Sequence, residues 1–222
     1  SLEPGFSISR MVLLDRGVIF AIAHVRGGGE YGLEWHKAGS KTNKLTTFED
    51  YKTVVEYLFK KKITNKELLI GRGDSAGGLI MGYMINNYSE YFVGIQTLSP
   101  FIDPIGELAN RNSFLSEREK DEWGSISDLQ DYAYISSYAP IENVPNKIDT
   151  RVFVRAASND PRININSVEA WVAKLRHSSL DNDAIVFYSN AESGHTGATN
   201  MLKRWENTAE ELAWALEIWN LY

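Results

Sequence analysis

Residues 68–88 combine a short apolar run, a turn rich in glycine and an apolar stretch of helical length. The turn at residues 73–77 (Gly-Asp-Ser-Ala-Gly) fits the pattern G-x-S-x-G. Between a strand and a helix, this pattern puts the serine on a sharp, strained turn, so that its hydroxyl projects above the sheet. Small neighbours are needed because bulkier side chains would collide there. The pattern therefore predicts an α/β domain in which Ser75 is a nucleophile and the Ala76 N–H faces a developing oxyanion.

The rest of the chain alternates between short apolar runs and amphipathic stretches, as in an α/β domain with a mostly parallel sheet. We expect strands over residues 18–24, 68–70, 93–98, 151–157 and 184–189. We expect helices over residues 7–15 and 167–177, one that starts at a capping box at 47–50, and one that follows the serine turn. A final helix is expected from the apolar stripe formed by Leu202, Trp205, Leu212, Leu216 and Trp219. The first of these strands is continuously apolar, as a strand buried on both faces would be.

Composition narrows the classes of function. The net charge of −6 argues against non-specific nucleic-acid binding, which needs a surplus of Lys and Arg. The absence of cysteine excludes a disulfide scaffold, a cysteine nucleophile and a thiolate metal site, and it fits a cytoplasmic protein. The longest apolar stretch, residues 17–25, is too short to span a membrane, and no signal peptide is visible. Because no cluster of ligands has metal spacing, we expect neither a metal nor a cofactor.

A serine hydroxyl needs a base, and the base needs an acid that orients it. In α/β domains of this kind the chain order is Ser, then Asp or Glu, then His. Among the four histidines, His195 alone has that order and lies in a flexible loop after the last expected strand. Two carboxylates, Asp160 and Asp103, follow expected strands between Ser75 and His195. The sequence therefore predicts a Ser75–His195 pair with one of these two acids.

The same turn also fits G-x-G-x-x-A over residues 71–76, the fingerprint of a dinucleotide-binding fold. That fingerprint belongs to the first strand of its unit and needs an acidic residue at the end of the second strand. Here another strand is expected before the turn, and the next strand ends at 98–100 (Leu-Ser-Pro) without an acid. The nucleophile interpretation is therefore favoured.

Seven segments together resemble the prolyl oligopeptidase family of serine peptidases, and within it the oligopeptidase B branch. They are residues 24–32 (His-Val-Arg-Gly-Gly-Gly-Glu-Tyr-Gly), 73–82, 122–124, 137–140, 159–162, 171–176 and 193–195. The resemblance covers nearly the whole chain. It implies that residues 1–222 form a single α/β-hydrolase catalytic domain that acts on short peptides, with Ser75, Asp160 and His195 as its triad.

The resemblance implies two further roles near the reacting atoms. Tyr31 matches a tyrosine that donates its hydroxyl to the oxyanion hole in prolyl-cleaving members, beside the Ala76 N–H. Known oligopeptidase B sequences often lack a tyrosine there, so this chain combines features of both branches. Arg162 matches an arginine that hydrogen-bonds the substrate backbone.

The same resemblance implies where substrate preference lies. Residues 101–138 read as an acidic, aromatic insertion that contributes the specificity pocket. Glu119 and Asp121 match acidic residues that receive a P1 Arg or Lys in oligopeptidase B, with Lys120 as the departure. Two carboxylates can bind a guanidinium in a bidentate manner, whereas a proline pocket would need an aromatic wall. We therefore expect cleavage after Arg or Lys.

Family members carry an N-terminal β-propeller and first sheet strands that are not in this sequence. In the hydrolase strand order, the strand before the helix at 7–15 lies between the strands expected at 18–24 and 68–70. Its loss leaves two strand edges unpaired, which is costly. We therefore expect a C-terminal piece whose sheet is incomplete at its N-terminal side, and which is completed by the missing N-terminal portion or by a second copy in a homodimer.

Two alternatives remain open. Residues 73–78 also resemble the hormone-sensitive lipase group, so a carboxylesterase or lipase of the same fold is one of them. Those enzymes form the oxyanion hole with an H-G-G-G loop, whereas Val25 and Arg26 separate His24 from the glycines here. The other alternative is an inactive, truncated remnant that serves as an interaction domain, which the missing strands favour.

Overall fold

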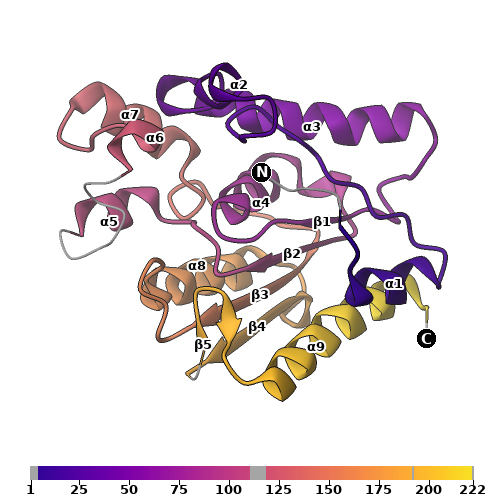
Figure 1. Ribbon diagram of the computed structural model, residues 1–222. Helices are drawn as coiled ribbons and strands as arrows, with labels where there is room; N and C mark the ends of the chain where they lie inside the picture. Colours follow the sequence, from indigo (N-terminus) through magenta and orange to yellow (C-terminus); the bar gives the residue numbers. More distant parts are fainter. Residues whose placement is uncertain (1–4, 111–118, 192, 222) are drawn as a thin grey trace.

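The computed structural model describes residues 5–110, 119–191 and 193–221. Its centre is a four-stranded parallel sheet with the order β1-β2-β3-β4 (Figure 1). The strands are β1 (Ile70–Arg72), β2 (Gly94–Leu98), β3 (Arg151–Ala157) and β4 (Ile185–Asn190). A separate antiparallel hairpin pairs β5 (Ser193–Gly194) with β6 (Gly197–Ala198).

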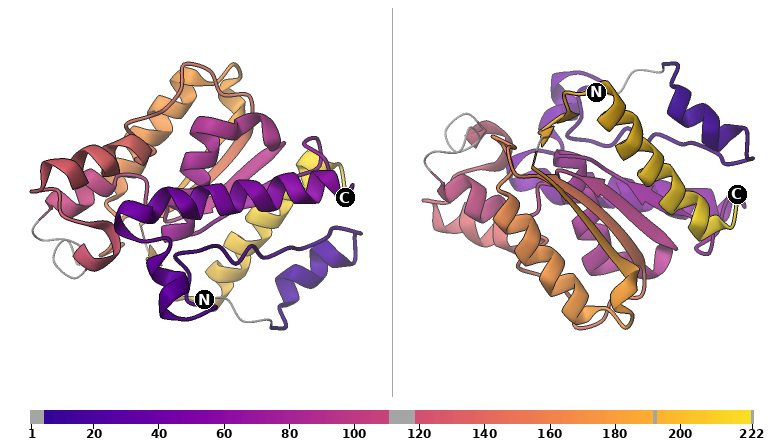
Figure 2. Two further views of the ribbon diagram at one scale, coloured as in Figure 1. Left: turned by 90° about the horizontal axis from the view of Figure 1, so that it is seen from above. Right: turned by 90° about the horizontal axis from the view of Figure 1, so that it is seen from below.

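Helices cover both faces of this sheet, as expected for an α/β-hydrolase fold (Figure 2). The helices are α1 (Ile8–Leu14), α2 (Leu33–Lys37), α3 (Lys44–Lys60), α4 (Ala76–Tyr88), α5 (Pro104–Ala109), α6 (Lys120–Trp123), α7 (Leu129–Tyr138), α8 (Ile165–Ser178) and α9 (Met201–Trp219). The larger core lies on the face with α3, α4 and α8. A smaller core on the other face packs Trp214 of α9 against Phe153 of β3.

The segment at residues 18–24 is not a strand, contrary to expectation. Ile19 and Phe20 in it are 68% and 38% exposed. Strand β1 is at the edge of the sheet, and no described strand pairs with its outer side. An extended segment without a hydrogen-bonding neighbour forms no ladder and is not buried on both faces. Strand β1 is thus an open edge of the sheet, whereas the second unpaired edge expected at 18–24 does not exist because that segment is not a strand.

Thr47 and Asp50 do not form a capping box, because α3 already begins at Lys44. The Thr47 hydroxyl instead donates to the carbonyl oxygens of Arg26 and Gly39, at 2.7 and 3.1 Å. The Asp50 carboxylate accepts hydrogen bonds from the backbone N–H and Nε of Arg26, at 2.9 and 2.8 Å. Both side chains therefore fix the glycine-rich loop to the helix instead of capping it.

The buried residues of helix α9 begin at Asn207, so the expected apolar stripe is wrong at the start of the helix. Leu202 and Trp205 are 70% and 50% exposed, whereas Trp214 and Leu216 are buried. Neither Leu202 nor Trp205 belongs to the apolar cores of the described residues. None of the helices among the described residues is long and apolar enough to cross a membrane.

Candidate active site

Ser75 lies at the tight turn between β1 and α4, as the sequence predicts. Its backbone has φ 54° and ψ −120°, in a region that non-glycine residues rarely adopt. The turn is held from both sides. The Ser75 N–H donates to the Leu98 carbonyl at 2.9 Å, and the Ser75 carbonyl accepts from the Phe101 N–H at 3.0 Å. These bonds to the last residue of β2 and to the chain that follows it keep the strained serine in place.

Two glycines around Ser75 are needed for close backbone approach. A Cβ on Gly73 would lie 2.3 Å from the Gly77 carbonyl oxygen, and one on Gly78 would lie 2.5 Å from the Cα of Pro100. Neither backbone contact can give way easily. The turn therefore requires small residues for the steric reason that its pattern suggests.

His195 lies at the tip of the β5–β6 hairpin rather than in a flexible loop. Ser193 pairs with Ala198 and Gly194 with Gly197, so a two-residue turn presents the imidazole. Gly197, the first residue after this turn, has a positive φ of 94°, a left-handed backbone that glycine adopts readily. The sequence did not predict the hairpin because its strands are only two residues long.

The three side chains expected to act together form a hydrogen-bonded line. His195 Nε2 lies 2.9 Å from Ser75 Oγ, and His195 Nδ1 lies 2.8 Å from Asp160 Oδ2. Asp160 Oδ1 accepts the backbone N–H groups of Arg162 and Ile163, at 2.8 and 3.1 Å. The Asp160 side chain is 1% exposed and that of His195 is 12% exposed. The line is thus nearly closed to solvent at its acidic end.

The surroundings keep the Asp160 carboxylate ionised. Burial by itself raises its pKa, but the hydrogen bond from His195 and the two backbone N–H donors outweigh burial and leave the pKa below its usual value. An ionised acceptor at Nδ1 favours the tautomer with its proton on Nδ1. The Nε2 lone pair then faces the Ser75 hydroxyl, and such an imidazole can accept the hydroxyl proton.

The other acid and the other histidines near this part of the chain have different partners. Asp103 caps α5, accepting the Gly106 N–H at 2.8 Å, and it also accepts the Ser167 hydroxyl at 2.9 Å. His24 Nδ1 lies 3.2 Å from a Glu30 oxygen. His36 Nδ1 lies 2.9 Å from the Gly27 carbonyl oxygen. Of the two acids that the sequence left open, the structure brings Asp160 to His195.

The two predicted oxyanion donors differ in their placement. At the start of α4, the N–H groups of Gly77 and Gly78 donate to the carbonyls of Asp74 and Ser75, and no described residue accepts the Ala76 N–H. Tyr31 is 71% exposed and packs edge-on against Trp35, with ring centres 5.0 Å apart. None of the hydrogen bonds or ring contacts of the described residues joins Tyr31 to Ser75. Tyr31 therefore stays a prediction.

The insertion at 101–138 lies partly outside the described residues, since 111–118 are not described, but both expected specificity residues lie within them. Glu119 accepts a hydrogen bond from Trp123 Nε1 at 2.6 Å. Asp121 is fully exposed and pairs with Lys41 at 3.0 Å. The structure therefore does not bring Glu119 and Asp121 to a common partner. Arg162 has an exposed side chain beside Asp160.

Sequence reasoning missed a buried ion pair between Lys44 and Glu122. The Lys44 side chain is 5% exposed, and its ammonium lies 4.5 Å from the centre of the Trp123 ring. Burial lowers the pKa of Lys44, and Glu122 opposes that shift. The Trp123 ring contacts Phe101 at 4.8 Å, the residue whose N–H donates to the Ser75 carbonyl. No signal in the sequence pointed to this pair, because Lys44 precedes the helix start expected at 47–50.

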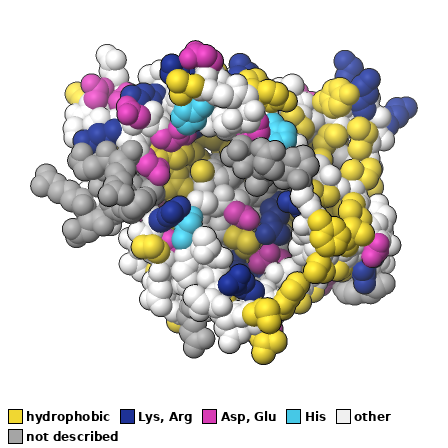
Figure 3. Space-filling model, viewed as in Figure 1, with side chains coloured by type: hydrophobic (Ala, Val, Ile, Leu, Met, Phe, Trp, Pro, Cys, Tyr) yellow, Lys and Arg dark blue, Asp and Glu magenta, His cyan; other side chains and the backbone are white. Residues whose placement is uncertain are grey.

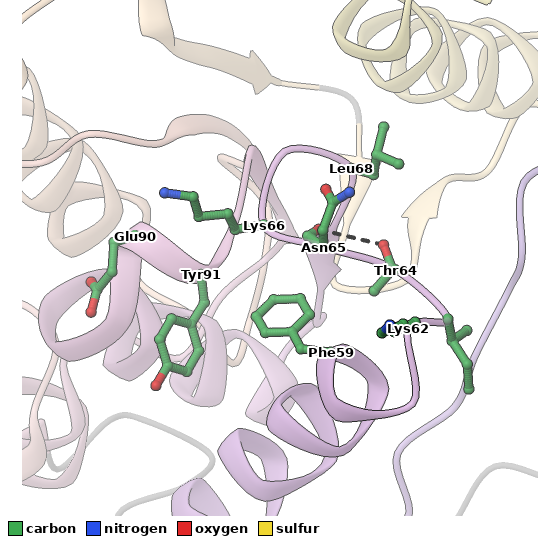
Figure 4. Close-up of a pocket in the computed structure, with 9 residues that line it drawn as sticks. Phe59, Lys62, Thr64, Asn65, Lys66, Leu68, Glu90 and Tyr91 are labelled. Carbon is green, nitrogen blue, oxygen red and sulfur yellow. Dashed lines mark hydrogen bonds between the residues drawn. The ribbon is translucent and has the colours of Figure 1, made fainter.

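A cavity of about 650 Å³ lies away from these residues, between the end of α3 and the chain that leads into β1 (Figure 4). Phe59, Tyr91 and Leu68 supply much of its apolar lining. Ser75 follows the carboxyl end of β1, whereas this cavity is at the amino end. Across residues 5–110, 119–191 and 193–221, no three side chains gather as a metal site needs.

Comparison with known proteins identifies the family. The model of the prolyl oligopeptidase family matches residues 4–221. The chain belongs to this family. It is 36% identical over 98% of its length to dipeptidyl aminopeptidase BI of Pseudoxanthomonas mexicana, and 34% identical over 97% to protease 2 of Moraxella lacunata. Oligopeptidase B from Leishmania major superimposes with a TM-score of 0.94 at 35% identity, over 98% of this chain.

The chain of this prolyl oligopeptidase family member is much shorter than its relatives. It spans 30% of the length of dipeptidyl aminopeptidase BI, 31% of protease 2 and 30% of the oligopeptidase B chain. The match confirms the α/β-hydrolase fold and a kinship with peptidases.

Proposed function

We propose that this chain is the catalytic part of a serine peptidase that hydrolyses short peptides through Ser75, His195 and Asp160. The observation that supports the proposal most strongly is the hydrogen-bonded line from Asp160 through His195 to Ser75 Oγ, at 2.8 and 2.9 Å. A structural turn serine has no need of a buried histidine and carboxylate behind it. The strained backbone of Ser75 supports the same interpretation.

In the proposed reaction, Ser75 Oγ attacks the scissile carbonyl while His195 Nε2 takes the hydroxyl proton. Asp160 stabilises the resulting imidazolium and holds its orientation. The imidazolium then returns the proton to the leaving amine. Water hydrolyses the acyl-enzyme, with His195 acting as base a second time. The Ala76 N–H, assisted by Tyr31, stabilises the oxyanion, and each such donor contributes about 3 kcal/mol to the transition state.

For specificity, we propose that the insertion at 101–138 forms the pocket and that Glu119 and Asp121 receive a P1 Arg or Lys, while Arg162 binds the substrate backbone. Support comes from the ring contact of Trp123 with Phe101, which links the acidic helix α6 to the chain beside Ser75. The names of the relatives, protease 2 and oligopeptidase B, agree with peptide substrates.

Fluorogenic peptides that differ only at P1 test both parts of the proposal. We expect turnover of P1-Arg and P1-Lys peptides by the wild type, and none by Ser75→Ala. Glu119→Gln and Asp121→Asn should each reduce the preference for Arg, while Glu142→Gln, an exposed acid that follows α7, serves as the control. Turnover of an ester with no turnover of any Arg amide would favour the carboxylesterase alternative.

We further propose that the open edge of β1 is completed by an added strand, either from a longer chain of this family or from a second copy. Exposed apolar side chains on α1 and the neighbouring segment support this, including Ile8 at 58%, Leu14 at 46% and Ile19 at 68% (Figure 3). Light scattering after size exclusion distinguishes the two sources, since only the second copy gives a dimer of this chain. A cytoplasmic location remains an expectation from the cysteine-free composition.

A further inference from the structure

A buried carboxylate lies on the opposite face of the sheet from α4, between two arginines that the proposed reaction does not use. Glu211 belongs to α9, and its side chain is 9% exposed. One oxygen lies 3.1 Å from an Arg72 guanidinium nitrogen, and the other lies 3.4 Å from Arg155 Nε. Burial raises the pKa of the Glu211 carboxyl, and both guanidinium groups oppose that rise.

The first arginine ties Glu211 to the turn that carries Ser75. Arg72 is the last residue of β1, three positions before Ser75. Its other guanidinium nitrogen donates to the Gln96 side chain on β2 at 3.0 Å. Gln96 in turn donates to the backbone carbonyl of Glu211 at 3.0 Å. The end of β1 is thus fixed by both the side chain and the backbone of one residue on α9.

The second arginine ties Glu211 to the strand that leads to Asp160. Arg155 belongs to β3, five positions before Asp160, and its backbone carbonyl accepts the Ser99 N–H at 2.7 Å. Its guanidinium also donates to Glu210 at 2.9 Å and to the Asn207 carbonyl at 3.1 Å. Strand β3, which leads to Asp160, is therefore held on α9 by the same cluster of charged residues.

Helix α9 itself begins directly after the hairpin that presents His195. Arg204, in the first turn of the helix, donates from Nε to the Ala198 carbonyl in β6 at 2.8 Å. Asn200 caps the helix by accepting the N–H groups of Leu202 and Lys203. A shift of α9 against the sheet would therefore move the hairpin relative to the ends of β1 and β3.

We propose that Glu211 is a positioning residue: through Arg72 and Arg155 it sets the distance of the Ser75 turn and the Asp160 loop from the helix that carries the His195 hairpin. The proposal rests on the proposed function of Ser75. Three segments that are far apart in sequence meet at this carboxylate, and a misplacement of about 1 Å in reacting groups can cost about 100-fold in rate. A solely stabilising charge would leave the reactivity of the folded protein unchanged.

The test is the second-order rate at which a small fluorophosphonate labels Ser75, because that reaction needs no specificity pocket. Glu211→Gln keeps the shape of the side chain and removes its charge. We expect it to slow labelling of the folded protein by at least about 10-fold. The control is Glu210→Gln, which removes a contact to the same Arg155 but none to Arg72, and it should label within about two-fold of wild type.

The outcomes separate the positioning role of Glu211 from the proposed function of Ser75. If Glu211→Gln is folded and is labelled at the wild-type rate, the positioning role is wrong while the proposed function stands. If the wild type is not labelled at Ser75, the proposed function itself is wrong. Should Glu211→Gln not fold, Glu211→Asp keeps the charge but shortens its reach, and we expect it to be slowed. Failure of both variants to fold would assign Glu211 to stability alone and overturn the proposal.

Discussion

Asparagine in place of Asp160 has an outcome that follows from the hydrogen bonds around the carboxylate. Oδ1 accepts the N–H groups of Arg162 and Ile163, and Oδ2 lies 2.8 Å from His195 Nδ1. An asparagine keeps its carbonyl oxygen on the two N–H donors, which turns its NH₂ group towards His195. Nδ1 must then accept a hydrogen bond, so the imidazole proton moves to Nε2, the atom that faces Ser75 Oγ.

In that tautomer the imidazole cannot take the hydroxyl proton of Ser75. The reactive tautomer returns only if the amide flips, which points its NH₂ group at two N–H donors and leaves both without an acceptor. Each unsatisfied buried donor costs about 1–3 kcal/mol, so the flip costs about 2–6 kcal/mol. At about 1.4 kcal/mol per factor of ten, Asp160→Asn should lower kcat/KM between about 30-fold and about 2 × 10⁴-fold.

Nitrogen NMR of the His195 ring reports the tautomer without any substrate. We expect the proton on Nδ1 in the wild type and on Nε2 in Asp160→Asn, with the rate of peptide hydrolysis or of fluorophosphonate labelling falling in parallel. Asp103→Asn, which alters the other candidate acid and still caps α5, should retain both properties. An Asp160→Asn protein that kept its proton on Nδ1 and lost less than about 10-fold in rate would refute the reasoning.

Three further predictions concern stability. The folded-state pKa of Asp160 is depressed. The wild type should therefore exceed Asp160→Asn in free energy of unfolding by a constant amount above about pH 5, and this difference should shrink as the pH falls below about 4. Urea unfolding at several pH values measures it. Gly78→Ala forces a Cβ to 2.5 Å from Pro100 and should lower the free energy of unfolding by about 1–3 kcal/mol in the same assay. Its control is Gly77→Ala, whose Cβ would meet no atom within 4 Å and which should not lower the free energy of unfolding. Glu122→Gln leaves the Lys44 ammonium buried without its anion and should cost about 3 kcal/mol; a loss below about 1 kcal/mol would contradict the buried-pair account.

Sequence patterns predicted the helices, strands and turns whose formation depends on residues close together in the chain. The strand at 151–157 has the predicted bounds, and the first helix begins after Ser7 and stops before Gly17 as expected. The strand predicted at 18–24 is wrong because a strand forms only beside a hydrogen-bonding partner strand. The sequence of the segment itself does not show whether such a partner is present. The turn at Ser75 was predictable because its strain, its glycines and its helix all lie within a few residues.

The parts of the site that the sequence did not predict depend on tertiary partners. His195 and Asp160 followed from chain order, but the hairpin that presents His195 is too short to leave a pattern. Glu122 and Glu211 are ordinary acids in the sequence, and only packing against Lys44, Arg72 and Arg155 gives them a role. The structure buries Glu211 on the same face of α9 as Trp214 and Ala215, a face that the stripe expected from the sequence did not include.

Mass spectrometry of the folded protein after reaction with a fluorophosphonate tests the central claim most directly. We expect one covalent adduct on Ser75, with none on Ser75→Ala and a strongly reduced yield when His195 is replaced by alanine. A folded wild-type protein that stays unmodified at Ser75, or that reacts equally well without His195, would contradict it.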